Sequence, residues 1–260
     1  MDFSTFVNKY KITGILTVYN ALHIGSGKEE EGKDSPFIKD NNGNFYIPGS
    51  SFRGYLSTKL ERILNSENNF KLIEKDTAEE LNEGDVKLIF GYTNLDEEDS
   101  EVINRVKEKV NIGNLEEITS MAGKIHVSDM PIITEVNSIK RDGIKIDRNT
   151  GATEDKAKFD YNVVPAGSKF KFEIELNNIE DYQLELIGLA LKDIVEDGDL
   201  FGGMLSRGIG KCKIEKSDLK IKYVDSKEKN NLKNYIFKKD MQDKSVDALF
   251  DVKHLDLKLR

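Results

Sequence analysis

Apolar and polar residues alternate in two parts of the chain. In the segment 11–20, Ile12, Leu16 and Val18 fall on one face of an extended chain, and threonines fall on the other. The segment 170–176 shows the same period of two. This alternation predicts β-strands that bury one face against a core.

Two longer segments place apolar residues three and four positions apart, which is typical of a helix with one buried face. The first helix is expected over residues 51–64 and the second over residues 182–195. Glycine flanked by aspartates at 197–199 is expected to end the second helix. Either Ser50 or Ser51 is expected to cap the first helix, because a serine hydroxyl accepts a hydrogen bond from a free backbone N–H.

Further signals complete the order of elements. A strand is expected at 124–127, and the glycine-containing turn 41–44 predicts a hairpin. The alternation of strands and helices favours an α+β fold in which helices cover one face of an antiparallel sheet, as in ferredoxin-like folds. Because no linker rich in glycine, serine and proline interrupts the 260 residues, we expect one domain over residues 1–260.

Two segments do not follow these patterns and are expected to be insertions. Residues 67–122 begin with an acidic stretch, since twelve acidic and three basic residues lie between 67 and 101. A run of like charges usually marks a solvated face, so we expect an acidic insertion or helical lid, with a partner-binding surface as the alternative. Residues 132–169 are expected to form a long projecting hairpin, because 139–148 is half charged and a turn follows. A flexible insertion is the alternative.

The composition narrows the classes of function. The net charge is −8, but the stretch 67–101 accounts for −9, so the remainder carries +1 and neither indicates nor excludes a nucleic-acid partner. Cys212 is the only cysteine, which excludes an intrachain disulfide and a zinc site made of cysteines, and the three histidines lack ligand spacing. No apolar run approaches the roughly 18 residues of a membrane span, and no signal-peptide pattern is present, so we expect a cytoplasmic protein.

Four glycines lie within nine residues in the segment 202–210. Glycines permit a tight loop with exposed backbone N–H groups, and Ser206, Arg207 and Lys211 add a hydroxyl and two cations, which suits an RNA phosphodiester backbone. A plain turn is the alternative. The segment has neither the lysine pattern of a nucleoside-triphosphate loop nor the spacing of a dinucleotide fingerprint, which argues against a metabolic nucleotide enzyme.

Two further segments are candidates for contacts with RNA. The start of the first helix combines free N–H groups, the positive end of the helix dipole and Arg53, which suits a phosphate, although an ordinary capped helix would have the same pattern. The hairpin segment carries several cations, and Ile144 or Ile146 could insert between nucleotides. The RNA-binding residues expected from the three segments are Ser50, Ser51, Arg53, Lys140, Arg141, Arg148, Gly202, Gly203, Ser206, Arg207, Gly208 and Lys211.

In this order and separation, the helix start and the glycine-rich loop resemble motifs of the RAMP superfamily of type III CRISPR-Cas systems. The resemblance is closest to the repeated subunit that wraps the guide RNA (crRNA) in Csm-like or Cmr-like effector complexes. It rests on segments spread over most of the chain, namely 22–27, 34–40, 47–54, 90–91, 140–167 and 202–210.

The resemblance implies a fold, an activity and partners. Such subunits have an RNA-recognition-like ferredoxin core, polymerise along the crRNA, and use a thumb, matched here by residues 132–165, to interrupt guide–target pairing. Catalytic members cleave bound target RNA with a divalent metal, Mg²⁺ or Mn²⁺, and with a loop aspartate that matches Asp34, which is therefore the expected catalytic residue and metal ligand. Asp40 is expected to be structural. The implied partners are crRNA, target RNA, other copies or related RAMP subunits, and the large and small subunits of the complex, with no membrane.

Three functions remain open at this point. The first is an antiviral backbone subunit that cuts RNA through Asp34, and the second is a structural crRNA-binding subunit in which Asp34 is inert. The acidic residues 29–31 depart from the smaller and more apolar loop of the family, and they either attract a metal or repel RNA. The third is a crRNA-end-capping or crRNA-processing protein. Processing would need a general base, and His23 and His126 are distant in sequence from the glycine-rich loop.

Overall fold

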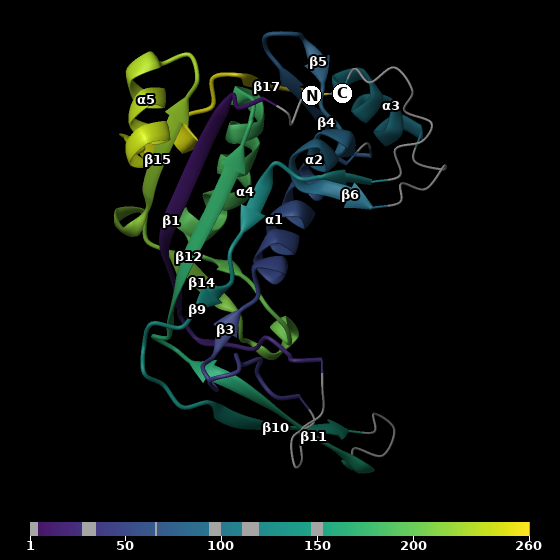
Figure 1. The fold of residues 1–260 in the computed structure, drawn as a ribbon. Coiled ribbons are helices and arrows are strands. Elements are labelled where there is room, and N and C mark those ends of the chain that lie inside the picture. The colour runs from purple at the N-terminus through teal and green to yellow at the C-terminus, as the bar shows by residue number, and fades with distance from the viewer. Residues whose placement is uncertain are drawn as a thin grey trace.

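The computed structural model describes residues 5–27, 35–65, 67–93, 100–110, 120–146 and 153–259. Its largest sheet is antiparallel, and β1 is its central strand (Figure 1). The strands follow one another across the sheet as β13 (Asp199–Leu200), β14 (Lys211–Ile214), β1 (Asn8–Val18), β12 (Lys169–Asn177) and β8 (Ile125–Val127). On the same edge of β1 as β14 lies β15 (Lys220–Asp225), which pairs with β16 (Gln242–Lys244).

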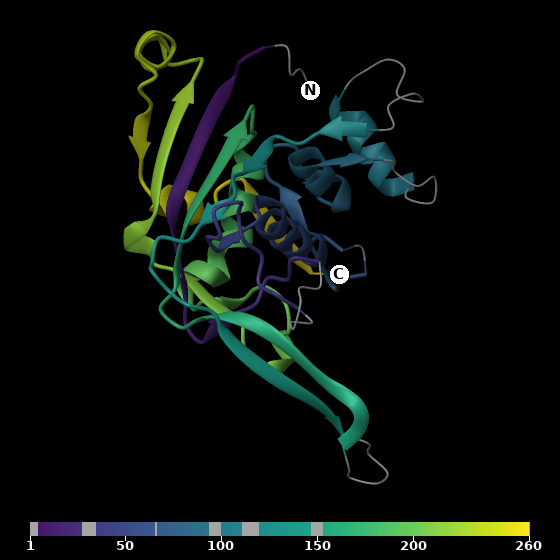
Figure 2. The ribbon, with the colours of Figure 1, turned by 60° about the horizontal axis from the view of Figure 1, so that its bottom comes forward.

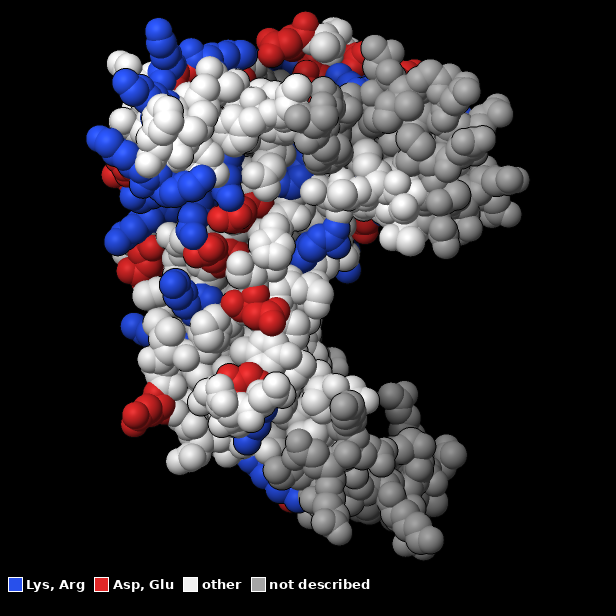
Figure 3. Space-filling model, viewed as in Figure 1, with Lys and Arg blue, Asp and Glu red and all other residues white. Residues whose placement is uncertain are grey.

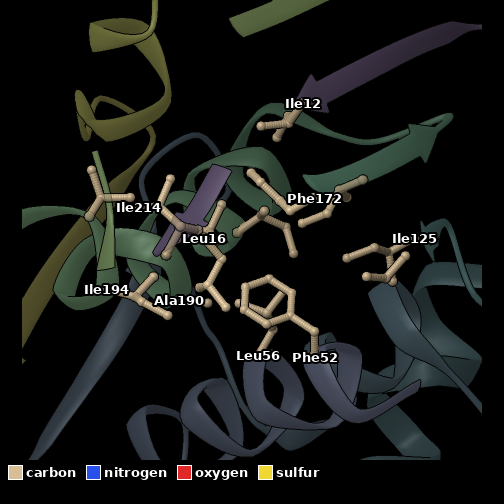
Figure 4. Close-up of a cluster of buried hydrophobic side chains, with 14 of the residues drawn as sticks. Ile12, Leu16, Phe52, Leu56, Ile125, Phe172, Ala190, Ile194 and Ile214 are labelled. Carbon is tan, nitrogen blue, oxygen red and sulfur yellow. The ribbon is translucent and has the colours of Figure 1, made fainter. Parts of the chain in front are cut away.

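Two helices cover one face of this sheet, α1 (Gly49–Ile63) and α4 (Asp181–Glu196). The buried face of β1 alternates strictly with its more exposed face, and Leu16 lies opposite Phe170 of β12. Figure 4 shows the resulting core, in which Phe52 of α1 and Ala190 of α4 approach Leu16. The strands and helices expected at these positions, and the mixed α and β class, are therefore confirmed, whereas the ferredoxin-like connectivity stays a prediction.

A smaller unit follows α1 and packs against the end of the core. Its strands and helices are β4 (Phe70–Glu74), β5 (Glu79–Glu80), α2 (Glu83–Phe90), β6 (Gly91–Thr93), α3 (Ser100–Val110) and β7 (Ser120–Ala122). The last strand of the chain, β17 (Leu255–Leu259), pairs with β4, so the C-terminal segment joins this unit. It is preceded by α5 (Lys229–Lys238) and α6 (Asp247–Phe250).

The acidic stretch is not simply a solvated face, and this expectation was wrong for two of its carboxylates. Asp85 is fully buried, and both of its oxygens accept from Arg105 Nε at 3.1 Å. Tyr182 of α4 donates its hydroxyl to the same carboxylate at 3.1 Å. Glu74 is also buried and pairs with Lys109 at 3.1 Å. These bonds are long-range, so charge content alone could not show that the acids are internal.

A long hairpin extends away from the body of the molecule (Figure 2). Its strands are β10 (Ile139–Ile146) and β11 (Thr153–Pro165), and the end of β11 pairs with β2 (Ala21–Leu22) at the base. The short pair β3 (Tyr46–Ile47) and β9 (Met130–Pro131) lies between the hairpin and α1. In Figure 3, which shares the view of Figure 1, the surface is hollowed beside α1 between the smaller unit and the hairpin. Lysine and arginine side chains gather on the opposite side, over β15 and α5.

Candidate functional site

A groove of about 790 Å³ lies between α1 and the glycine-rich loop. It brings together two motifs that are far apart in the sequence, since Ser51 and Gly54 line one wall and Gly202 and Gly203 line the other. The rest of the lining consists of Ile24, Gly25, Tyr55, Thr58, Lys59, Arg62, Asp193, Asp199, Leu200, Phe201 and Leu205. The walls therefore offer hydroxyls and a short apolar floor, with basic groups at one end.

The helix α1 starts in a different way from the one expected. Neither Ser50 nor Ser51 caps it, because the N-cap residue is Pro48 and no side chain there accepts a hydrogen bond. Instead, Asp129 accepts from the backbone N–H of Gly49 at 2.8 Å. A Cβ at Gly49 would clash with the carbonyl group of Val127 at the end of β8, so only glycine fits this approach. The Asp129 carboxylate therefore satisfies one of the free N–H groups at the start of α1, and Ser51 faces the groove.

One face of α1 forms the groove wall, and it is the face opposite the buried stripe. Gly54 lies in the helix interior on this face, and a Cβ there would meet no atom within 4 Å. Arg62 is an exposed cation at the far end of the same face. Among the residues that the structure describes, no carboxylate lies within ion-pair distance of Arg62. Arg62 was not predicted as a site residue, although its spacing from Ser51 places both on one helical face.

The neighbouring cation, Lys59, is held by acids of the opposite wall. Its ammonium group donates to Asp193 at 2.6 Å and to Asp199 at 2.8 Å. Tyr55 donates its hydroxyl to Asp199 at 2.7 Å, and burial followed by this hydrogen bond raises the pKa of Tyr55. The group joins α1 to the end of α4 and to β13, and it fixes the width of the groove at that point.

The expected RNA contact Arg53 does not line the groove. One of its N–H groups donates to the carbonyl of Phe90 at the end of α2, and its guanidinium lies 5.5 Å from the centre of the Phe90 ring. Arg53 therefore joins α1 to the smaller unit, and a contact with RNA stays a prediction.

The glycine-rich loop is closed by backbone hydrogen bonds to β2 and to itself. Gly203 donates to the carbonyl of His23 at 2.8 Å, and Gly210 donates to the carbonyl of Ala21 at 2.7 Å. Gly202 has a φ of +96°, and a Cβ there would lie 2.7 Å from the His23 carbonyl oxygen. The loop thus needs glycine both for its backbone conformation and for its approach to β2.

The polar residues of the loop differ in whether their side chains are exposed or bound to other parts of the protein. Ser206, Arg207 and Gly208 are exposed, and no atom lies within 4 Å of a Cβ placed at Gly208. The ammonium group of Lys211 donates to the carbonyl of Gly198 at 2.6 Å, next to the end of α4. Lys211 therefore stabilises the loop, whereas Ser206 and Arg207 present their side chains to solvent.

His23 lies beneath this loop, a proximity that its position in the sequence did not indicate. It is 3% exposed, and its Nδ1–H donates to the carbonyl of Asn162 in β11 at 2.7 Å. Since a carbonyl can only accept, Nδ1 carries a proton, and Nε2 lies 3.1 Å from the hydroxyl of Ser35, which can act as its donor when the ring is neutral. His23 thus connects the base of the hairpin, the glycine-rich loop and the residue that follows Asp34. Both of its ring nitrogens are engaged.

Asp34 and Arg148 lie outside the described residues, as do the acids 29–31. Ser35 is described, and its backbone pairs with β11 around Tyr161, donating to the carbonyl of Asp160 at 3.2 Å and accepting from the N–H of Asn162 at 3.0 Å. Asp40 belongs to a turn, because its carboxylate accepts from the backbone of Asn44 at 2.8 Å. The hydrogen bond from Asn44 is the main cause that lowers the pKa of Asp40.

On the hairpin, Lys140 and Arg141 are exposed. Lys140 forms an ion pair with Asp160 of the opposite strand at 2.6 Å, and Arg141 lies opposite Tyr161. Within the part of the chain that is described, no three histidine, cysteine or acidic side chains gather into a potential metal site. None of the helices in that part is long and apolar enough to cross a membrane.

Two comparisons with known proteins identify the family of the chain. A family model described as the RAMP superfamily matches residues 15–213, a range that contains α1, the hairpin and the glycine-rich loop. The chain is also 30% identical over 234 residues to the CRISPR system Cms endoribonuclease Csm3 of Methanocaldococcus jannaschii, with 85% of this chain and 84% of that protein covered. The resemblance inferred from the sequence is confirmed: the chain belongs to the RAMP superfamily.

Proposed function

We propose that this chain is the backbone subunit of a type III CRISPR effector complex, that it binds crRNA along its sugar-phosphate backbone, and that it cleaves bound target RNA. The observation that carries the proposal is the groove between α1 and the glycine-rich loop, in a chain of the RAMP superfamily. The relative from Methanocaldococcus jannaschii bears the name of an endoribonuclease of a CRISPR system, which supports the same assignment.

The groove suits a nucleic-acid backbone rather than base edges. Ser51 and Thr58 supply hydroxyls, Arg62 supplies a cation, and the glycines of both walls let a ribose-phosphate chain come close. Phosphate contacts of this kind position a strand without reading its sequence. A subunit that repeats along guides of any sequence requires such recognition.

The proposed core is ferredoxin-like. The order β14, β1, β12, β8 across the sheet, with α1 after β1 and α4 after β12, supports this connectivity. The hairpin formed by β10 and β11 is the candidate thumb, and its exposed Ile144 is the candidate wedge between nucleotides. The proposed partners are crRNA, target RNA, further copies or related RAMP subunits, and the large and small subunits of the complex.

For cleavage we assign Asp34 as the catalytic residue. The 2′-oxygen of the target RNA forms a bond to the adjacent phosphorus while the bond from that phosphorus to the 5′-oxygen breaks. The 2′-hydroxyl loses its proton and the 5′-oxygen gains one. The products are a 2′,3′-cyclic phosphate and a 5′-hydroxyl. Asp34 would orient the 2′-hydroxyl or hold a divalent ion. Because a single carboxylate makes a weak protein site for Mg²⁺ or Mn²⁺, the ion would take most of its ligands from RNA and water. The ion would supply stabilisation of negative charge at the phosphate.

A crRNA-processing activity through His23 is disfavoured. A general base must reach the hydroxyl that it deprotonates, and His23 is buried with Asn162 and Ser35 on its two ring nitrogens. Its hydrogen bonds instead suit a structural role at the base of the hairpin.

The assignment of Asp34 is tested with assembled complexes that carry Asp34→Asn or the control Asp40→Asn. With Mg²⁺ or Mn²⁺ present, we expect Asp34→Asn to bind target RNA as the wild type does and to cut it at least about a hundredfold more slowly. Asp40→Asn should cut normally, because Asp40 serves a turn. A target with a single 2′-deoxynucleotide at the cleavage position should resist cutting by the wild type. Normal cutting by Asp34→Asn would show that the subunit only carries RNA or that another residue acts.

A further inference from the structure

Arg207 of the glycine-rich loop stacks on an aromatic ring of the hairpin. Its guanidinium carbon lies 4.6 Å from the centre of the Phe159 ring. On the loop side, Nε of Arg207 lies 3.4 Å from the sulfur of Met204. Two contacts from different elements therefore hold the plane of the guanidinium, although the residue is exposed.

The ring of Phe159 is itself fixed by the hairpin. Phe159 lies opposite Gly143 in the register of β10 and β11, and a Cβ at Gly143 would clash with the ring. On its own strand, Phe159 stacks with Tyr161 at 6.3 Å between ring centres and 20° between planes. The Phe159 ring thus packs across the backbone of Gly143 and stacks with the guanidinium of Arg207. A larger residue at position 143 would displace this ring.

Arg207 differs from the nearby lysines because no described residue accepts a hydrogen bond from its two terminal nitrogens, while its Nε–H donates to the Met204 sulfur. Lys211 donates to the carbonyl of Gly198, and Lys140 pairs with Asp160. In contrast, no carboxylate of the described residues lies within ion-pair distance of Arg207. Stacking uses the face of a guanidinium and leaves the N–H groups at its edge for acceptors, and such a planar edge matches two oxygens of one phosphate.

We propose that Arg207 binds one phosphate of single-stranded RNA as a planar fork, and that Phe159 and Gly143 are positioning residues that hold the fork in place. The glycine-rich loop and the hairpin then form a single phosphate-binding unit. This inference rests on the proposed function and deepens it, because it names the group that recognises the backbone at the hairpin and the residues that orient it. A phosphate bound here is in contact with an arginine that touches the hairpin, so binding also favours one orientation of the hairpin.

The chemistry of the fork is tested by exchanging Arg207 in the full chain. The probe is a fluorescein-labelled single-stranded RNA of mixed sequence, and its affinity is measured by anisotropy over a series of salt concentrations. Arg207→Ala should weaken binding about tenfold to a hundredfold, as expected for a charge-assisted bond, and should reduce the salt slope by about 0.7. Arg207→Lys should keep the salt slope, because the positive charge remains. It should still weaken binding roughly fivefold, because an ammonium group neither stacks on the ring nor offers two parallel donors to one phosphate. Wild-type affinity for Arg207→Lys would overturn the proposal.

The positioning role is tested at Phe159. Phe159→Leu should weaken RNA binding about threefold with an unchanged salt slope, whereas Phe159→Tyr should bind RNA as the wild type does. In a protein that already carries Arg207→Ala, Phe159→Leu should cause no further loss of affinity. The matched control is Phe237→Leu, because Phe237 of α5 is 76% exposed and no cation of the described residues lies over its ring. Additive losses, or a loss that Phe159→Tyr fails to restore, would overturn the role of Phe159. Failure of the wild type to bind the probe at low salt would overturn the proposed function itself, which is a distinct result.

Discussion

Replacing Gly54 should change stability and RNA binding in opposite directions. Gly54 lies inside α1, where glycine is less favourable than alanine by about 0.8–1.0 kcal/mol. A Cβ at this position would meet no atom within 4 Å, so nothing in the described structure requires glycine there. Gly54→Ala should therefore raise the free energy of unfolding by about 1 kcal/mol and the melting temperature by about 2–4 °C.

The same position faces the groove, so a larger acidic side chain should oppose RNA. A carboxylate about 6 Å from a phosphate costs roughly 3 kcal/mol at an effective dielectric constant near 20. Screening at an open groove reduces this to about 1–2 kcal/mol, which corresponds to a fivefold to thirtyfold loss of affinity. Gly54→Gln separates bulk from charge and should lose less. Asn230→Glu, on the exposed side of α5, adds the same charge far from the groove and should leave affinity unchanged.

Urea unfolding and anisotropy with labelled single-stranded RNA measure the two effects on the same preparations. The expected result for Gly54→Glu is a protein at least as stable as the wild type that binds RNA more weakly than both Gly54→Gln and Asn230→Glu. Equal affinity for the three variants would refute the placement of RNA in the groove. A loss of stability in Gly54→Ala would refute the argument that only an external partner makes glycine useful here.

Arg105→Ala should lower the free energy of unfolding by about 3–5 kcal/mol in urea, because the fully buried Asp85 would lose its counter-ion; a loss below about 1 kcal/mol would contradict the importance of this pair. The hydrogen bond to Asp76 raises the pKa of His254 in the folded protein. The stabilisation that this bond gives the fold is therefore fully present below the pKa of an unfolded histidine, near 6.5, and is lost as the pH rises through the higher pKa of the folded state. The decline in stability above about pH 6.5 should therefore be shallower in Asp76→Asn, and an identical pH profile would count against the bond. Burial raises the pKa of Cys212 to about 12, so iodoacetamide should label this thiol only as fast as the core opens, and rapid labelling in native buffer would contradict the packing.

Local periodicity predicted the elements that form the core. The stripe that includes Phe52 and Leu56 sets the position of α1, and the alternation in β1 and β12 sets the buried face of the sheet, because both patterns repeat within a few residues. The glycine-rich loop and the helix start were also recognised as candidates for contacts with RNA. Their meeting in a groove was not predicted, since no local pattern relates the two segments.

Interactions between distant segments account for the features that were not predicted from the sequence. The expected serine cap failed because Asp129, which follows β8, reaches the N–H of Gly49. The acids Glu74 and Asp85 looked solvated because their partners, Lys109 and Arg105, come later in the chain. In each case a hydrogen bond or ion pair depends on the tertiary fold, and the residue types alone do not identify the partner.

We propose that the groove between α1 and the glycine-rich loop holds the backbone of a guide RNA. A cryo-electron microscopy map of the complex assembled with crRNA would show where the guide lies. We expect several copies of this chain in a row, each with ribose-phosphate density between Gly54 and Gly203. Guide density that lies outside this groove, for example over the exposed lysines of β15, or a complex with a single copy of the chain, would contradict it.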